Sequence, residues 1–128
     1  EFPCRDVTKN KVTSQIRIKQ MISYIDQHFH ERISLEDIAE AASISKREAL
    51  RCFRENMGKT PFSYLTEYRV NQGKNKLLSG NDTVLEIALA CGFDSASYFN
   101  RVFRRYVNIR LPHGGKIAAK FFHILTGR

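Results

Sequence analysis

The sequence predicts an all-α fold in which two helix-turn-helix subdomains are joined by a long linker helix. One short pattern occurs twice, in residues 34–58 and 83–108, and a long helical segment lies between the copies. Because internal repeats decide the architecture of a chain, this repetition is the strongest signal in the sequence. We expect the first subdomain at residues 14–58, the linker helix at 60–79, and the second subdomain, with an atypical C-terminal tail, at 83–128.

The linker segment, residues 60–78, has the pattern of one uninterrupted helix. Thr60 is a good N-cap, since its hydroxyl can accept a hydrogen bond from an unpaired backbone N–H. Pro61 follows at the first helical position, where its missing N–H costs nothing, and Gly80 is expected to end the helix. About 18 residues at roughly 1.5 Å each give a rod of about 27 Å.

The two copies of the repeat align with one extra residue in the second turn. A shift of 49 residues places Leu35, Ile38, Ala39 and Ala42 on Val84, Ile87, Ala88 and Cys91. After the turn the shift is 50, and Ala49, Cys52 and Phe53 correspond to Phe99, Val102 and Phe103. Met57 in the first copy and Tyr106 in the second complete the two apolar faces. In each first helix the apolar residues recur at i, i+3, i+4 and i+7, which is the spacing of one buried helix face.

Helix caps mark where these short helices begin. Ser34 with Asp37, and Thr83 with Glu86, are capping-box pairs, and Ser45 with Glu48 is expected to cap the second helix of the first copy. Two short capped helices with a tight turn describe a helix-turn-helix. One such motif is weak evidence of DNA binding, and the alternative for two copies is a helical scaffold for protein partners.

The composition is that of a basic globular chain. Its 128 residues include 21 Lys and Arg against 13 Asp and Glu, a net charge of +8, and the mean hydropathy is −0.39. Such a charge is the signature of a polyanionic partner, although a basic protein without one is the simpler alternative. No apolar run approaches the ~18 residues of a membrane span and no signal peptide is visible. We therefore expect a cytoplasmic, nucleoid-associated protein without a membrane partner.

Catalytic motifs are not found in the sequence. It contains no phosphate-binding glycine loop, nucleophile elbow, paired metal ligands or evident acid–base pair. The three cysteines, Cys4, Cys52 and Cys91, lack metal-ligand spacing, and the last two lie on predicted buried faces, where cysteine acts as a small hydrophobe. We expect no enzymatic activity, no metal and no cofactor.

A long series of residues matches one known pattern. Its most specific part is in the second copy, where Gly92-Phe93 is followed by Ser97-Tyr98-Phe99 and Arg101-Val102-Phe103-Arg104. Further matches are Ile38-Ala39, Ser45, Phe53-Arg54, Gly58-Lys59-Thr60-Pro61, Tyr64-Leu65, Arg69, Leu77-Leu78, Ile87-Ala88 and Cys91. On these residues the chain, over about residues 16–106, resembles the DNA-binding domain of the AraC/XylS family of bacterial transcription regulators.

The resemblance implies a homeodomain-like, AraC-type fold that binds double-stranded DNA. In that family the second helix of each unit enters one of two successive major-groove segments. It also implies RNA polymerase as a partner and, for many members, a sensor domain elsewhere in a longer chain. Two departures from the family pattern are Gly73, where alanine is usual, and the tail after Tyr106, which lacks the usual aromatic–arginine pair. A glycine in a helix interior costs ~1 kcal/mol and favours either a bend or close packing.

The residues expected to read base edges lie at the start and on the outer face of each second helix. They are Lys46, Arg47, Leu50 and Arg51 in the first copy, and Ala96, Ser97, Tyr98, Asn100 and Arg101 in the second. Arginine can donate two hydrogen bonds to guanine, asparagine can pair with adenine, and leucine offers an apolar contact to a thymine methyl group. The alternative for each cation is a solvated surface charge.

A second group is better placed for phosphates, which position a protein without reading sequence. It consists of Ser45, Arg54, Lys59, Ser95, Arg104 and Arg105. Successive major-groove faces recur every ~34–36 Å, a distance that a rod of about 27 Å plus the width of each unit can span. A binder of nucleic acid without sequence preference remains the second alternative.

Three further expectations concern single segments. Residues 1–13 show no periodicity and are expected to be the end of a linker or an added tail, followed by a helix from about Ser14 to His30 whose apolar stripe is Ile18, Ile22, Ile25 and Phe29. Arg69 is expected to pair with a carboxylate such as Glu67 or Glu86. Residues 116–125 are expected to form a short closing helix.

Overall fold

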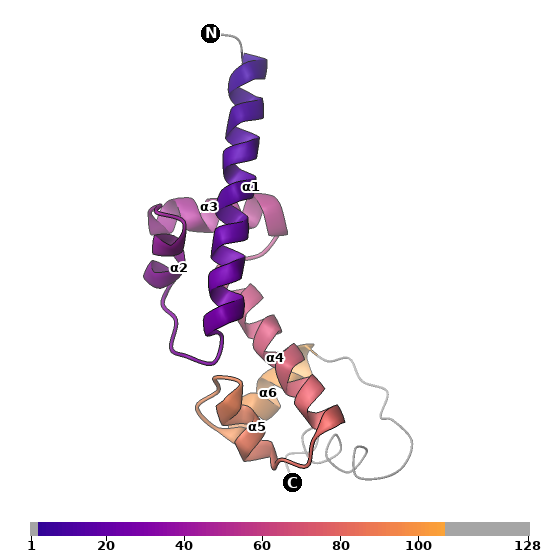
Figure 1. Cartoon of the computed structure of the whole chain (residues 1–128). Coiled ribbons are helices and arrows are strands. Elements are labelled where there is room, and N and C mark those ends of the chain that lie inside the picture. Colours follow the sequence, from indigo (N-terminus) through magenta and orange to yellow (C-terminus); the bar gives the residue numbers. More distant parts are fainter. Residues whose placement is uncertain (1–2, 107–128) are drawn as a thin grey trace. The chain divides into compact units, whose positions relative to one another are not determined.

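Six α-helices make up the part of the chain that the structure describes. The computed structural model describes the backbone of residues 3–106 and the side chains of residues 11–106. The helices are α1 (Pro3–His28), α2 (Leu35–Ala41), α3 (Lys46–Met57), α4 (Pro61–Ser79), α5 (Val84–Ala90) and α6 (Ala96–Tyr106) (Figure 1). The predicted all-α fold class is confirmed, while the expected closing helix at 116–125 lies outside the described residues.

The helices belong to two compact units. The first comprises Glu1–His28 and Arg32–Leu65, and the second comprises Phe29–Glu31 and Thr66–Arg128. The boundary therefore falls within α4, whose first residues belong to the first unit. The three residues after α1 belong to the second unit, although they precede the first helix-turn-helix in the sequence.

The first unit is a three-helix arrangement of α1, α2 and α3, each packed against the other two (Figure 1). Its core takes Ile18, Met21 and Ile25 from α1, together with Ile38, Ala39, Ala42, Ala49, Cys52, Phe53 and Leu65. Most of the apolar positions that the periodicity assigned to a buried face are in this core, whereas Leu35 and Met57 are only partly buried. The i, i+3, i+4 spacing works because residues three and four apart share one side of a helix.

Three details of α1 differ from the prediction. The helix begins at Pro3 rather than near Ser14 and ends at His28 rather than His30, because periodicity reports a buried face and not helicity itself. Met21 is fully buried, whereas Ile22 is only partly buried. Phe29 lies beyond the helix and packs against the core of the second unit.

The second unit closes around aromatic side chains. Its core contains Val70 and Leu77 from α4, Ile87 and Ala88 from α5, and Cys91, Phe93, Phe99, Val102 and Phe103 from the turn and α6. Tyr106, which the periodicity placed on the buried face, is 38% exposed at the end of α6. Burial raises the pKa of the Cys91 thiol to about 11, so this side chain stays neutral, as expected for a small hydrophobe.

The predicted caps are present. Thr60 Oγ1 accepts a hydrogen bond from the backbone N–H of Ser63 at 3.1 Å, and Pro61 is the first residue of α4. Ser34 with Asp37, and Thr83 with Glu86, form complete capping boxes at α2 and α5. These local side-chain bonds satisfy donors that have no partner within the helix.

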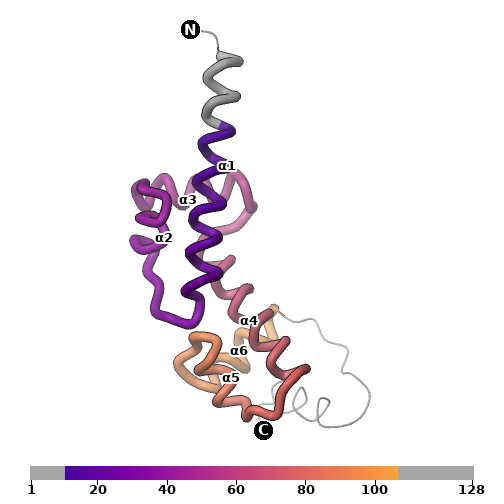
Figure 2. Tube along the Cα trace, in the orientation of Figure 1, coloured from indigo at the N-terminus to yellow at the C-terminus, as the bar shows by residue number. Residues whose placement is uncertain are grey.

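A tight turn joins the two short helices of each helix-turn-helix (Figure 2), and one residue in each turn has a left-handed backbone. Ser43 has φ of 56° in the first turn, and Gly92, the corresponding residue, has φ of 93° in the second. A Cβ atom on Gly92 would lie 2.6 Å from the carbonyl oxygen of Phe29 and 2.8 Å from Nε of Arg69. Glycine is therefore required in the second turn by space as well as by conformation.

Arg69 does not form the predicted carboxylate pair. Its Nε donates to the carbonyl oxygen of Phe29 and its Nη2 to that of Glu31, both at 2.7 Å. Sequence spacing could not show this, since the acceptors are backbone groups about 40 residues away. Burial lowers the pKa of Arg69 but leaves it charged, and charge-assisted bonds to carbonyls are among the stronger hydrogen bonds.

Gly73 allows close packing in α4. A Cβ atom there would lie 2.7 Å from Cε1 of the buried Phe99 ring. The helix of 19 residues continues through this position. Of the two explanations offered by the sequence, the close approach of a neighbouring side chain is the one that the structure supports.

We predict that Gly92→Ala destabilises the protein by about 2 kcal/mol or more, because it combines a left-handed backbone with contact against a carbonyl oxygen. Ser43→Gly is the matched control and should be neutral or stabilising by up to ~1 kcal/mol. Urea unfolding followed by circular dichroism measures both. Equal effects of the two substitutions would contradict the close approach at Gly92.

We predict that Gly73→Ala fails to stabilise α4, since overpacking against Phe99 costs ~1–3 kcal/mol and outweighs the ~1 kcal/mol gain in helix propensity. In a Phe99→Leu background the same substitution should become stabilising, because the ring edge is gone. Thermal melting of the four proteins in this double-mutant cycle gives the coupling. Additive effects would show that the ring is not the obstacle.

Candidate nucleic-acid interface

The outer face of α3 is lined with arginine. Ala49, Cys52 and Phe53 are buried and lie on the side of α3 that packs against the core. The opposite side faces solvent. That side carries Arg47, Arg51 and Arg54, all of which are exposed, with Lys46 exposed at the start of the helix. The structure thus brings together on one helix face the cations that the sequence singled out.

The corresponding face of α6 is more mixed. Phe99, Val102 and Phe103 are buried, and the exposed side carries Ser97, Arg101 and Arg104, with Arg105 and Tyr98 also exposed. Ala96 and Asn100 are only partly exposed. The second helix therefore offers fewer cations and more neutral side chains than the first.

Serine caps the start of both helices. Ser45 Oγ accepts from the backbone N–H of Glu48 at 3.2 Å, and Ser95 Oγ accepts from that of Tyr98 at 3.1 Å. A hydroxyl that accepts a hydrogen bond still has its own O–H to donate. Both serines can therefore cap the helix and contact a phosphate at once.

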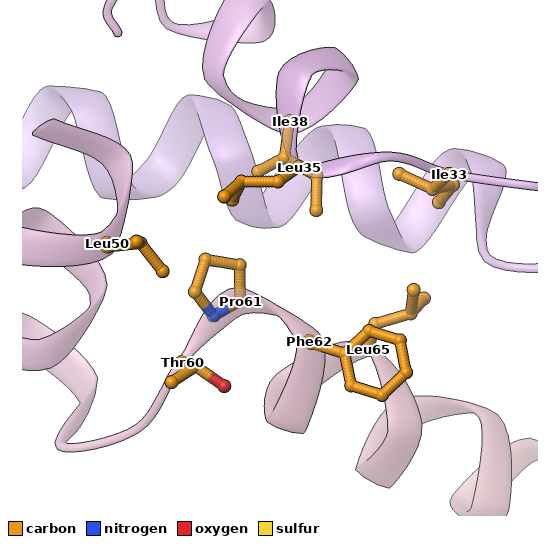
Figure 3. A pocket seen from close by; sticks show the side chains of 8 residues that line it. All are labelled: Ile33, Leu35, Ile38, Leu50, Thr60, Pro61, Phe62 and Leu65. Atoms are coloured by element: carbon orange, nitrogen blue, oxygen red, sulfur yellow. The ribbon is translucent and has the colours of Figure 1, made fainter. Parts of the chain in front are cut away.

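Leu50 borders an apolar pocket within the first unit. The pocket is lined by Ile33, Leu35, Ile38, Leu50, Thr60, Pro61, Phe62 and Leu65 (Figure 3). Leu50 is 40% exposed and Phe62 is 63% exposed. The leucine thus presents a partly open apolar surface beside the arginine face of α3, in line with the expected apolar contact.

Arg51 is held by two carboxylates of its own helix. Its Nε and Nη2 donate to the two carboxylate oxygens of Glu48, each at 2.8 Å, and its Nη1 lies 3.5 Å from Glu55. The hydrogen bonds that Arg51 donates to Glu48, and then the negative charges of Glu48 and Glu55, raise the pKa of Arg51 further above its usual range. Glu48 was expected only as the partner of the Ser45 cap, although its i, i+3 spacing to Arg51 already indicated a side-chain pair.

Arg101, the counterpart of Arg51, is supported by an aromatic ring instead. Its guanidinium carbon lies 5.6 Å from the centre of the Tyr98 ring, and Tyr98 in turn packs edge-on against Phe93 at 5.8 Å. A cation–π contact attracts the guanidinium without occupying its N–H donors. Tyr98 thus contacts the neighbouring arginine as well as solvent.

Asn100 is less open than the sequence suggested. Its Oδ1 is buried, and within the described part of the chain it has no hydrogen-bond partner. The position corresponds to Leu50, which borders the pocket in the first unit. An asparagine turned partly inward is poorly oriented for pairing with adenine unless its side chain rotates.

The remaining predicted phosphate contacts differ in exposure. Arg54 and Arg105 are exposed in the last turns of α3 and α6, whereas Lys59 is partly buried between α3 and α4. Among the side chains of residues 11–106, no cluster of His, Cys, Asp and Glu is arranged to hold a metal ion. None of the helices described combines the length and hydropathy that a membrane span requires.

Comparisons with known proteins identify the domain type. A family model described as a helix-turn-helix domain matches residues 38–111. An uncharacterized HTH-type transcriptional regulator, YdeC of Bacillus subtilis, is 38% identical over 73% of this chain and 32% of its own length. The transcriptional activator RhaS of Enterobacter sp. is 33% identical over 70% of this chain and 32% of its own length. The chain spans about a third of the length of these curated relatives.

Solved structures show the same arrangement of helices. An AraC-type regulator from Chromobacterium violaceum matches with a TM-score of 0.73 and 27% identity, over 88% of this chain and 95% of that one. The DNA-binding domain of AdpA, solved with a target DNA, matches with a TM-score of 0.69 and 29% identity, over 86% and 94% of the two chains. With the repeated helix-turn-helix and its exposed basic helices, these matches show that the chain belongs to the AraC/XylS-type family of helix-turn-helix DNA-binding domains.

Proposed function

We propose that this chain is the DNA-binding domain of a bacterial transcription regulator and binds double-stranded DNA sequence-specifically through α3 and α6. The observation that carries the proposal is the exposed face of α3, where Arg47, Arg51 and Arg54 lie together opposite the core. An α-helix with its side chains is roughly 10–12 Å in diameter and fits a major groove ~12 Å wide. Similarity to the AdpA domain, solved with its target DNA, supports the same mode.

The two helices take successive major-groove segments, and α4, shared by the two units, links them. The functional division is into subdomains 14–58 and 83–128 with the linker at 60–79, and the first turns of α1 precede the first subdomain. Base edges are read by Lys46, Arg47, Leu50, Arg51, Ala96, Ser97, Tyr98, Asn100 and Arg101. Phosphates are contacted by Ser45, Arg54, Lys59, Ser95, Arg104 and Arg105, which supply affinity without sequence information.

Other partners follow from the relatives. The match covers only about a third of the length of the curated relatives, which supports a sensor domain as a further partner. RNA polymerase is the second proposed partner, because regulators of this kind act at promoters. A cytoplasmic, nucleoid-associated location fits both, and a protein of this family has no need of enzymatic activity.

Selection from a random ~25-base-pair duplex pool, followed by affinity against salt, tests the proposal. An asymmetric site with two informative blocks about ten base pairs apart is the expected result. A strong salt slope with equal affinity for all sequences would indicate a non-specific binder. No enrichment and no salt slope would favour a protein-interaction adaptor.

We predict that Arg51→Ala loses about 1–3 kcal/mol of binding free energy on the selected duplex and relaxes the preference at one base pair. The reason is the loss of two hydrogen bonds to guanine. Titration against the selected duplex and its single-base variants measures the effect. An equal loss on every sequence would assign Arg51 to a phosphate.

We predict that Arg104→Ala weakens binding to all duplexes by a similar factor and reduces the salt slope by about one charge. A phosphate contact releases counterions wherever the protein binds, whatever the base sequence. The measurement is affinity at four salt concentrations on the selected and a scrambled duplex. A selective loss on the selected duplex would make Arg104 a base reader.

A further inference from the structure

The carboxylate at the third position of a helix usually returns to the N-cap in this chain, but not in α3. Asp37 in α2 and Glu86 in α5 each accept a hydrogen bond from the N-cap backbone N–H. Glu48 occupies the same position in α3, where Ser45 is the cap, and directs both carboxylate oxygens to Arg51 instead. The side chain therefore does something besides capping.

The contact leaves one edge of the Arg51 guanidinium open. A guanidinium carries five N–H donors in a planar fork. Glu48 occupies the side edge: Nε lies 2.8 Å from Oε1, and Nη2 lies 2.6 Å from Oε1 and 2.8 Å from Oε2. Among the described residues, the end edge, formed by Nη1 and the second N–H of Nη2, has the longer approach of Glu55 at 3.5 Å from Nη1. Two parallel donors at that edge match the O6 and N7 acceptors of guanine.

Glu48 is itself contacted from α1. Nη1 of Arg17 lies 4.0 Å from Oε2 of Glu48, within the first unit. The series Arg17, Glu48 and Arg51 connects the supporting helix to the exposed face of α3. A long side chain held in this way loses fewer rotamers when it binds, which favours the bound geometry.

From these contacts we propose that Glu48 is a positioning residue that holds Arg51 for end-on recognition of guanine and so sets the base preference at that position. The proposal rests on the proposed function, in which α3 reads the major groove. Glu48 acts through Arg51 and needs no contact with a base. Its negative charge also disfavours approach to phosphates, so it lowers affinity for all DNA while sharpening the choice among sequences.

The second unit shows a related solution at the corresponding position. Tyr98, also three residues before the arginine, places its ring 5.6 Å from the guanidinium carbon of Arg101. A support for the exposed arginine therefore occurs in both recognition helices, by an ion pair in one and a cation–π contact in the other. The ion pair directs individual N–H donors, whereas the ring constrains only the position of the group.

The test compares Glu48→Gln with Glu55→Gln. Both substitutions are isosteric and remove one negative charge from α3, so the general electrostatic effect on DNA binding is matched. The readout is the affinity ratio between the selected duplex and a variant in which the guanine read by Arg51 is replaced by adenine. We expect Glu48→Gln to lower this ratio roughly threefold to fivefold, the upper part of the range of an exposed ion pair, and Glu55→Gln to preserve or raise it.

As a control for folding, a thermal melt of each variant is recorded, and binding is measured well below the melting transition. Glu48→Ala provides a second variant and should lower the ratio at least as far as Glu48→Gln. A ratio unchanged in both Glu48 variants, or lowered equally by Glu55→Gln, would overturn the proposal.

Arg51→Ala separates this inference from the function on which it rests. If Arg51→Ala does not change the base preference, the proposed role of Arg51 fails, and the role of Glu48 fails with it. If Arg51→Ala does change it, adding Glu48→Gln should have no further effect on the ratio. A further loss in the double variant would instead mean that Glu48 contacts a base directly, as a carboxylate can with cytosine.

Discussion

The second unit depends on the contact that Arg69 makes with the backbone of residues 29–31. Backbone carbonyls outside helices need hydrogen-bond donors when they are shielded from water. Arg69 donates to two such carbonyls, those of Phe29 and Glu31, each at 2.7 Å. The turn at Gly92 approaches the same carbonyl so closely that no side chain fits there. Phe93, the next residue, enters the aromatic core, so this contact also places the start of α6.

The second helices of the two units, α3 and α6, share one pattern of buried residues but expose different side chains. In each second helix three apolar residues at equivalent positions face the core, and the side opposite is exposed. In α3 that side carries Arg47, Arg51 and Arg54. In α6, Ser97 takes the place of the first of these arginines. The binding contributions of the two helices should therefore differ in kind, with a stronger electrostatic share from α3.

Equivalent positions also carry different constraints. Ser43 and Gly92 adopt the same left-handed backbone, but only the second is crowded by a neighbouring carbonyl. Leu50 borders an apolar pocket, whereas Asn100 has a buried oxygen that no described residue satisfies. Repetition of a sequence pattern thus preserves the helices while each unit adapts the contacts around them.

The sequence alone determined helices α2 to α6, their caps and most of their buried positions. These features depend on neighbours within about four residues, which is why Thr60, Ser34 with Asp37, and the spacing of Ala49 and Phe53 could be interpreted correctly. The family likeness likewise followed from residues such as Gly92-Phe93 and Arg101. The full length of α1 was missed because a helix without an apolar stripe has no periodic signal.

Only the tertiary structure decided contacts between residues distant in sequence. Arg69 donates hydrogen bonds to backbone carbonyls and not, as expected, to Glu67 or Glu86. Phe29 was expected on the apolar stripe of α1 but packs against the core of the second unit. Gly73 was ambiguous until the ring of Phe99 was found against it. The partner of the Glu48 carboxylate was equally undecided, because Ser45 and Arg51 both lie three residues away. The structure shows that Glu48 accepts hydrogen bonds from Arg51. Residue spacing does not show which backbone carbonyl a side chain will reach, which ring will pack against a glycine, or which of two local partners a carboxylate will choose. These contacts are fixed only when the chain folds, so only the tertiary structure shows them.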